Sequence, residues 1–471
     1  LDALIRTVSR LPDAAAAILT YMWQFSDNLR ALYETPTLAE LDVSSGNTLA
    51  AERVLLNVRE AGRTILTEME SKLLLSVYGI PTVDTYLART AEDAARTAEH
   101  IGFPVVLKLH SESLTHKTDV GGVVLNLQES ESVQRAFHQI RQSVLEKAGP
   151  GHFDGVSVQA MIPLDGYELI LGSSIDPQFG PVLLFGTGGQ LVEVWRDRAL
   201  GLPPLTSTLA RRMMERTRIL KALKGVRGRG QVNLEALEHL MVRFSRLVIE
   251  QPMIKEVDIN PLLVSEHRMI ALDARVIVHD RSVPLDKLPR PAIRPYPIQY
   301  VGLAQLRDGE RILFRPVRPE DEPLLAQFFQ GLSDRSVAMR FFQPLKASTR
   351  SSHDRMVRIC HRHYDREISL VAEQRASKQT PASILGLGSL SRMANPESAE
   401  FALLVDDSHQ KNGLGTELLR RLINIGREEG LKLIVGSILR DNHEMIHLCK
   451  KLDFEIVDDA KDNVVRAQLT L

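Results

Sequence analysis

The stretch that decides the fold is Gln410-Lys411-Asn412-Gly413-Leu414-Gly415, a short turn with two glycines. An apolar run at 401–405, which predicts a buried strand, precedes it, and apolar residues at helical spacing follow it. The free N–H groups at such a helix start favour negative charge, so the turn is a candidate anion site. Because Gly413 and Gly415 lack a Cβ, a phosphate group can approach the backbone closely. An ordinary strand-to-helix turn is the alternative that the hexapeptide alone leaves open.

Two polar residues near this turn are candidates for chemistry or binding beside it. An amine has an unperturbed pKa of about 10, and a carboxylate in a dry cleft can remove its proton. Glu400 opens the strand that leads to the turn, so we expect its side chain to emerge beside the turn. A charged strand end that faces solvent is the alternative. Asn442 begins a predicted helix after the next strand, where it can act as an N-cap.

Length and composition indicate a multidomain α/β and α+β protein. At 471 residues about two to four domains are expected, and 44% apolar with 25% charged residues is ordinary for a globular protein. The formal net charge of -1 argues against a nucleic-acid or membrane-surface protein, and no apolar run approaches the length of a membrane span. With only Cys360 and Cys449, a reducing cytoplasm is expected. The chain begins with Leu1, so we expect it to start inside a longer protein; the sequence does not predict an oligomeric state.

Four segments follow one another along the chain. Residues 1–58 are predicted to be the helical tail of a domain whose body is missing, which the resemblances described below imply to be acyl-CoA synthetase-like. Residues 59–280 mix helices and strands as an α/β domain does. Residues 281–309 contain five prolines and predict a semi-rigid linker, and residues 310–471 predict a strand-rich domain with a mixed sheet. A single helix is expected over 209–223, with its basic residues on a solvated face.

The second segment holds residues suited to a nucleotide. Lys108 stands in an apolar strand, where a buried lysine needs an anionic partner unless it reaches water from an edge strand. Gly121 and Gly122 end a polar loop that suits either a phosphate cradle or a solvated hairpin. Asn260 and Asp273 offer oxygen ligands on neighbouring strands, as Mg²⁺ beside a nucleoside triphosphate requires.

In this order, these features resemble the ATP-grasp unit of ADP-forming acetyl-CoA synthetases and of the succinyl-CoA synthetase β subunit. The resemblance includes the stretches Thr115-His116-Lys117-Thr118-Asp119, Gly186-Thr187-Gly188-Gly189 and Glu256-Val257-Asp258-Ile259-Asn260-Pro261. It implies that Lys108 contacts ATP phosphates, that His116 relays a phosphoryl group, and that Asn260 and Asp273 hold Mg²⁺. The CoA-binding and substrate-phosphorylating domains of those synthetases are not recognisable, so a full ligation cycle on this chain alone is not expected.

The last segment resembles the acetyltransferase domain of bacterial Pat-type protein lysine acetyltransferases, which are GNAT acyltransferases. The resemblance rests on the (Gln/Arg)-x-x-Gly-x-(Gly/Ala) pattern of the glycine turn, on residues 332–342, on Tyr364-Asp365-Arg366-Glu367 and on Ala399-Glu400-Phe401. That family joins an acyl-CoA-synthetase-like module to a C-terminal GNAT domain in this order. The resemblance implies acetyl-CoA as the cofactor, held by Val405, Gln410, Lys411, Asn412, Gly413, Leu414, Gly415, Thr416 and Asn442.

The same resemblance implies that Glu400 is the general base and that the acceptor is a lysine of another protein, often an AMP-forming acyl-CoA synthetase. Two departures stand out: the N-terminal CoA-binding part is absent, and Asp453 replaces the usual Gly before Phe454, where a left-handed backbone is expected. No Tyr follows Asn442, so no general acid is assigned. We predict a protein lysine N-acetyltransferase. The alternatives are an ADP-forming acyl-CoA ligase subunit, a non-catalytic acyl-CoA or nucleotide sensor, and a GNAT enzyme with a small amine acceptor.

Overall fold

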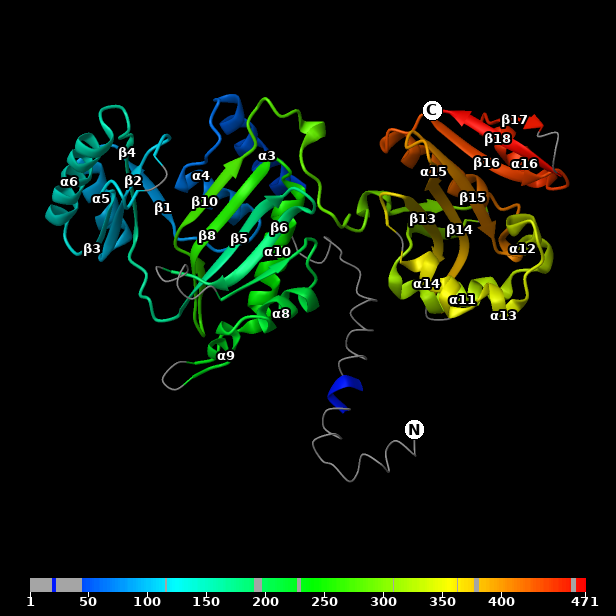
Figure 1. Cartoon of the computed structure of the whole chain (residues 1–471), viewed down its shortest axis with the longest axis horizontal. Helices are drawn as coiled ribbons and strands as arrows, with labels where there is room; N and C mark the ends of the chain where they lie inside the picture. The colour runs from blue at the N-terminus through cyan, green and yellow to red at the C-terminus, as the bar shows by residue number, and fades with distance from the viewer. Residues whose placement is uncertain are drawn as a thin grey trace, which may run out of the picture. The chain divides into compact units, whose positions relative to one another are not determined.

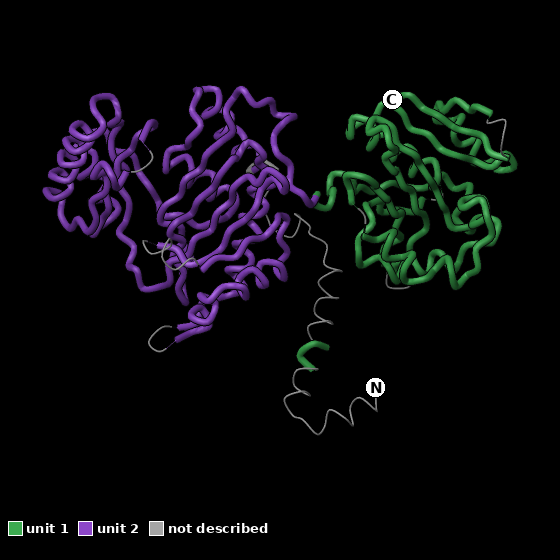
Figure 2. Tube along the Cα trace, viewed as in Figure 1, with its two compact units in different colours: residues 1–39, 294–471 green, residues 40–293 purple. Residues whose placement is uncertain are grey.

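The computed structural model describes two compact units (Figures 1 and 2), Glu40–Ile293 and a second that contains Arg294–Leu471. None of the helices in the described ranges combines the length and apolar character of a membrane span. Cys360 and Cys449 are both buried and free of disulfides. The described ranges are 19–22, 45–114, 117–189, 197–226, 230–307, 309–361, 363–376, 381–458 and 463–471, with side chains from residue 48 onward in the second of them.

A four-stranded antiparallel sheet carries Lys108 in the first unit. Helix α5 (Ala91–Ile101) packs a face of alanines and helix α6 (Ser130–Ala148) packs larger apolar residues onto this sheet. Leu107 and Leu109 are fully buried in that core, so the alternation along the strand points Lys108 to the opposite face. The strand order is β1 (Thr85–Ala88), β4 (Gly155–Ala160), β2 (Val105–His110) and β3 (Val123–Leu127).

A larger sheet lies in the same unit, with one apolar face and one polar face. Val257 and Ile259 on β8 are buried in the core, so Asp258 and Asn260 lie on the opposite face. The strand order is β10 (Ala274–Val278), β8 (Ile254–Val264), β5 (Tyr167–Asp176), β6 (Gly180–Thr187) and β7 (Arg198–Gly201), with β9 (Met269–Ala271) paired to β8. The helices that share this core are α3 (Ser45–Glu60), α4 (Glu68–Val77), α8 (Ser207–Glu215), α9 (Ile219–Leu223) and α10 (Leu234–Glu250).

Two segments differ from the sequence-based expectations here. Helix α3 begins in the predicted tail 1–58 and ends two residues beyond it, and its Ala51, Leu55 and Val58 are fully buried in the core of the first unit. The expected single helix over 209–223 is wrong, because the chain forms α8 and α9 with a break between them. The carboxylate of Asp197 accepts the backbone N–H groups of residues 218 and 219 at 2.7 and 2.8 Å, which starts the second helix anew.

The second unit is built on an eight-stranded mixed sheet with helices on both faces (Figure 1). Neighbouring strands are antiparallel except for one parallel pair, β15 and β16. Helices α15 (Leu414–Glu428) and α16 (His443–Lys451) contribute to one core, and α11 (Glu322–Gly331), α12 (Asp334–Phe341) and α14 (His353–Cys360) to the other; α13 (Ala347–Arg350) contacts α11. The strand order is β11 (Gly302–Gln305), β12 (Arg311–Pro316), β13 (Glu367–Gln374), β14 (Ser383–Arg392), β15 (Ser398–Val405), β16 (Leu433–Leu439), β18 (Val464–Thr470) and β17 (Glu455–Asp458).

The later half of the predicted linker 281–309 belongs to this second unit. Strand β11 pairs with β12 as the edge of the sheet. Tyr296 and Tyr300 are buried, and their hydroxyls donate to the carbonyl of Pro316 at 2.9 Å and to Glu429 at 2.6 Å. The tyrosines therefore anchor a stretch whose prolines alone predicted an extended linker.

Candidate functional site

A fork between two strands forms the centre of the second unit. Strand β15 pairs with β14 along its length but with β16 at only three positions, which end at Glu400 and Val435. Beyond them the two parallel strands are no longer paired, and the ring of Phe401 lies against Gly436. A Cβ at position 436 would lie 2.3 Å from Phe401 Cε1, so only glycine fits there.

Glu400 stands at the end of the paired region, on the exposed side of the sheet. The hydroxyl of Ser437 donates to Glu400 Oε1 at 3.1 Å. Both side chains line a cleft of about 1200 Å³. The structure therefore places the predicted base inside a cleft large enough for a cofactor-sized ligand.

The glycine turn lines the same cleft. Gly413 has φ +94° and stands immediately before α15, so the backbone N–H groups that follow it begin the helix. A Cβ at 413 would meet nothing closer than 3.8 Å, whereas a Cβ at Gly415 would lie 3.3 Å from Leu448 Cδ1. Gly413 therefore supplies the left-handed backbone, while Gly415 also allows α15 to approach α16.

The remaining predicted acetyl-CoA residues divide into two groups. Gln410 donates from Nε2 to the carbonyl of Val405 and to Ser336 Oγ, both at 3.2 Å, so its side chain ties the turn to β15 and α12. Leu414 is fully buried in the core, and neither it nor Asn412 lines the cleft. The predicted residues that line the cleft are Val405, Gln410, Lys411, Gly413, Gly415, Thr416 and Asn442.

Two local expectations, at Asn442 in the cleft and at Asp453 outside its lining, agree with the structure. Asn442 Oδ1 accepts the N–H of Met445 at 3.1 Å, so Asn442 is the N-cap of α16. Asp453 has φ +66°, the left-handed conformation expected where Gly is usual.

A row of polar residues to which the sequence alone assigned no role lies beside Glu400. In the sheet register Glu367 lies opposite Ser391, which lies opposite Glu400, so all three share one face. Arg340 of α12 lines the same cleft; burial lowers the pKa of its guanidinium, and the charge of Glu400 opposes that shift. Arg340 and Glu367 stand in stretches that carry the family resemblance, but only the folded strands show that they lie beside Glu400.

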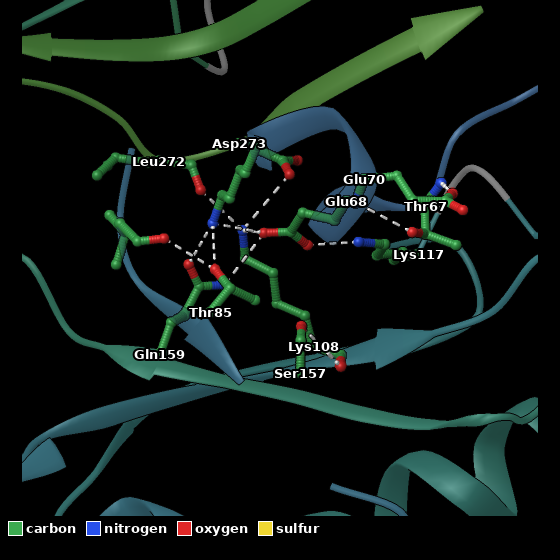
Figure 3. Close-up of polar contacts among 12 residues, drawn as sticks. Thr67, Glu68, Glu70, Thr85, Lys108, Lys117, Ser157, Gln159, Leu272 and Asp273 are labelled. Atoms are coloured by element: carbon green, nitrogen blue, oxygen red, sulfur yellow. Dashed lines mark hydrogen bonds and ion pairs between the residues drawn. The ribbon is translucent and has the colours of Figure 1, made fainter. Parts of the chain in front are cut away.

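The first unit holds a second candidate site, a cluster of three lysines around Glu68 (Figure 3). Lys72 and Lys108 both place Nζ 2.9 Å from Glu68 Oε1, and Lys117 places Nζ 2.5 Å from Oε2. Burial acts to raise the pKa of Glu68, but the ammonium groups of Lys108, Lys117 and Lys72 outweigh it and hold the pKa well below its usual range. The carboxylate is therefore ionised although its side chain is only 3% exposed.

Lys108 thus has the anionic partner that its burial demands, and that partner is a protein carboxylate. Its Nζ also donates to the carbonyl of Leu272 at 3.1 Å and lies 3.5 Å from Asp273 Oδ1. Burial acts to lower the pKa of Lys108, and Glu68 and Asp273 together raise it above its ordinary value. Glu68, Lys72 and Lys117 were not predicted as site residues, although the (i, i+4) spacing of Glu68 and Lys72 on α4 is a local signal for the first two.

Gly121 and Gly122 shape the loop that carries Lys117. Gly121 has φ +70°, and Gly122 donates its N–H to the carbonyl of Lys117 at 2.7 Å. A Cβ at 122 would lie 2.8 Å from Leu109 Cβ, so the turn fits only with glycine. In the structure these glycines close the loop onto β2; His116 lies outside the described residues.

The polar face of β8 offers oxygen ligands for a metal ion. Asn260 Oδ1 accepts the N–H of Gly189 at 2.8 Å, and Asp273 is 47% exposed. Asp258, which the sequence analysis did not single out, has a buried Oδ1 without a hydrogen-bond partner in the described residues, and burial raises its pKa. No group of three or more His, Cys, Asp or Glu side chains that could hold a metal occurs in those residues. Asn260 and Asp273 as ligands of Mg²⁺ stay a prediction, and Asp258 adds a further oxygen donor on the same strand as Asn260.

Comparisons with known proteins define the class to which this architecture belongs. Residues 57–278 match the family model of the ATP-grasp domain, and residues 311–455 match that of the acetyltransferase (GNAT) domain. The chain therefore combines an ATP-grasp domain with a GNAT domain C-terminal to it, and the predicted fold class is confirmed.

The first domain has well-matched relatives. The β subunit of ADP-forming acetate–CoA ligase I from Pyrococcus furiosus is 38% identical over 230 residues, which are 49% of this chain and 99% of that subunit. The chain belongs to this family of ADP-forming acyl-CoA ligase β subunits through its ATP-grasp domain. The ADP-forming acetate–CoA ligase I of Archaeoglobus fulgidus is 36% identical over 51% of this chain. The match covers only 34% of that ligase's length.

The second domain resembles known acetyltransferases. An acetyltransferase of Pseudomonas aeruginosa is 27% identical over 158 residues, which are 34% of this chain and 82% of that protein. The crystal structure of the GNAT domain of S. lividans PAT matches with 27% identity and a TM-score of 0.34, over 37% of this chain and 99% of that one. The GNAT domain supports the prediction of an acyltransferase; the roles of single residues stay predictions.

Proposed function

We propose that the chain is a protein lysine N-acetyltransferase that uses acetyl-CoA. The observation that carries this proposal is the single cleft of about 1200 Å³ in which a carboxylate at the strand fork and a glycine turn at a helix start lie together. The start of α15 suits a pyrophosphate group, because its N–H groups and the helix dipole favour anions. Unpaired edges of β15 and β16 beyond Glu400 suit the extended, amide-containing arm of an acyl-CoA.

Glu400 is the residue that would remove the proton from the acceptor amine. Lysine has an unperturbed pKa of about 10.4, so it needs a base before its nitrogen can attack the thioester carbonyl. The hydrogen bond from Ser437 orients Glu400 Oε1 and leaves Oε2 for the ammonium group. The C–N bond forms, the C–S bond breaks, and CoA leaves as a thiolate; no general acid is assigned to it.

The acceptor distinguishes the proposal from its closest alternative. The chain is incubated with labelled acetyl-CoA and either purified AMP-forming acyl-CoA synthetases or small amines, with and without ATP and Mg²⁺. Label on a synthetase lysine supports the proposal. Label on small amines alone contradicts a protein acceptor but is consistent with acetyltransferase activity. A change in the rate of transfer with ATP would indicate that nucleotide binding in the first domain affects transfer.

A second candidate function is nucleotide-dependent acyl-CoA synthesis. The 38% identity over 99% of a ligase β subunit favours it. The experiment mixes the chain with ATP, Mg²⁺, acetate and CoA and follows ADP and acetyl-CoA. Formation of both by this chain alone would support a ligase, whereas ATP binding without product would leave the first domain as a nucleotide sensor.

The glycine turn gives a first prediction with a matched control. Gly413→Ala is expected to cost about 1–2 kcal/mol of stability, because φ +94° is strained for alanine, and to raise the KM for acetyl-CoA. Gly430→Ala is the control, because Gly430 has φ +70°, open space around it and no place in the cleft. Thermal unfolding and initial rates test both variants. Equal KM values for the two variants would contradict the placement of the pyrophosphate at the turn.

The metal ligands give a second prediction. Asp273→Asn is expected to weaken binding of ATP with Mg²⁺ by about tenfold, because one anionic oxygen ligand of the hard cation is lost. Isothermal titration calorimetry with increasing Mg²⁺ measures the effect. Asp280→Asn is the control, since Asp280 is exposed and bonds Ser282. Equal affinity in both variants would contradict a role of Asp273 in metal binding.

A further inference from the structure

The lysine cluster of the first unit carries more positive than negative charge. Lys72, Lys108 and Lys117 contact Glu68, and Asp273 lies 3.5 Å from Lys108, so three cations face two carboxylates. The side chains of the three lysines are only 4%, 12% and 16% exposed, respectively. Because buried charge is unfavourable unless it is compensated, this excess of positive charge favours binding of a further anion.

The three lysines differ in how firmly they are held. Lys72 donates to Thr85 Oγ1 at 2.9 Å and to Gln159 Oε1 at 2.8 Å in addition to its contact with Glu68. All three of its N–H donors are thus engaged. For the side chain of Lys117, by contrast, Glu68 is the one ion-pair partner among the described residues, and Lys117 lies on the loop closed by Gly121 and Gly122. Lys117 can therefore leave Glu68 at little cost, whereas Lys72 cannot.

Glu68 also keeps partners if Lys108 and Lys117 leave. Gln159 Nε2 donates to Glu68 Oε1 at 3.2 Å, and Lys72 lies 2.9 Å from the same oxygen. The carboxylate is thus held in place from the buried side by Lys72 and Gln159. Lys108 shares Oε1 with these two residues and Lys117 contacts Oε2, and both lysines are more exposed than Lys72.

We propose that Glu68 competes with the phosphate chain of a nucleoside triphosphate for Lys108 and Lys117. The phosphate chain draws these two lysines from Glu68, while Lys72 and Gln159 retain the carboxylate. Glu68 thereby weakens nucleotide binding and keeps the lysines ordered until a polyphosphate arrives. The inference rests on the nucleotide-binding role of the ATP-grasp domain and is independent of acetyl transfer.

The test compares polyphosphate affinities of the full chain and its Glu68→Gln variant. Isothermal titration calorimetry measures the Kd of ATP with Mg²⁺ and, separately, of inorganic tripolyphosphate. Removing the competing charge is expected to tighten both by about tenfold, because like charges in close contact are strongly unfavourable. Glu70→Gln is the matched control: Glu70 lies two residues along the same helix but pairs with Arg63 at 2.7 Å, so its affinities stay at the wild-type values.

Further variants keep the proposal falsifiable if Glu68→Gln does not fold. In Glu68→Asp the side chain is one methylene shorter, so the carboxylate lies farther from the lysines. This variant is expected to tighten tripolyphosphate binding less than Glu68→Gln does. Lys117→Met is expected to weaken tripolyphosphate binding by several-fold. If the wild type binds ATP or tripolyphosphate and the Glu68 variants bind it equally or more weakly, the proposed competition is overturned, while the nucleotide site remains. If neither wild type nor variants bind ATP or tripolyphosphate, the nucleotide site itself is overturned as well.

Discussion

Replacing Glu400 by glutamine is expected to lower the turnover number for acetyl transfer by roughly 10²–10⁴-fold. Glutamine keeps a carbonyl oxygen for the hydrogen bond from Ser437, so the side chain keeps its position but cannot accept a proton. The KM for acetyl-CoA and the circular dichroism spectrum are expected to stay close to those of the wild type. Release of free CoA thiol with saturating acceptor measures the turnover.

Glu397→Gln is the control for this experiment. Glu397 is exposed, precedes the same strand and pairs with Lys432 at 2.6 Å outside the cleft. Its turnover number is expected to equal that of the wild type. A Glu400→Gln variant that folds and turns over at the wild-type rate would refute Glu400 as the base.

Replacing Glu68 by glutamine is expected to lower the free energy of unfolding of the first unit by about 3–5 kcal/mol. The reason is that the buried ammonium groups of Lys72 and Lys108 lose their compensating charge. Glu70→Gln is expected to have a smaller effect, because its pair with Arg63 is 28% and 19% exposed. Urea unfolding followed by circular dichroism measures the three free energies.

The same comparison has a defined pH dependence. The pKa of Glu68 is held well below its usual range in the folded protein, since Lys108, Lys117 and Lys72 outweigh the effect of burial. The stabilisation is therefore fully present above the pKa of an unfolded glutamate, about 4.3, and is lost as the pH falls through the folded pKa. The difference between wild type and Glu68→Gln should shrink on acidification; a difference that is constant with pH contradicts this explanation.

Local sequence patterns were sufficient to predict the parts of the cleft that depend on neighbouring residues. The apolar run of β15, the glycines before α15 and the cap residue Asn442 act over a few positions, and each lies where it was expected. The left-handed Asp453 was likewise predictable, because the conformational preference of a single residue decides it.

Contacts between distant residues were the part that could not be predicted. The break between α8 and α9 depends on Asp197, about twenty residues upstream. Lys108 was recognised as needing an anion, but its partner Glu68 lies 40 positions away. The row of Glu367, Ser391 and Glu400 exists only through strand register, which a single sequence does not specify.

The most direct test of the central claim is the transfer of labelled acetyl from acetyl-CoA to a purified AMP-forming acyl-CoA synthetase, with mass spectrometry to identify the modified residue. We expect the wild-type chain to label a lysine side chain of the synthetase and the Glu400→Gln variant to leave the synthetase unlabelled. Glu397→Gln is expected to label the synthetase as the wild type does. No label on any protein, although acetyl-CoA binds to the chain, would contradict the assignment as a protein lysine acetyltransferase.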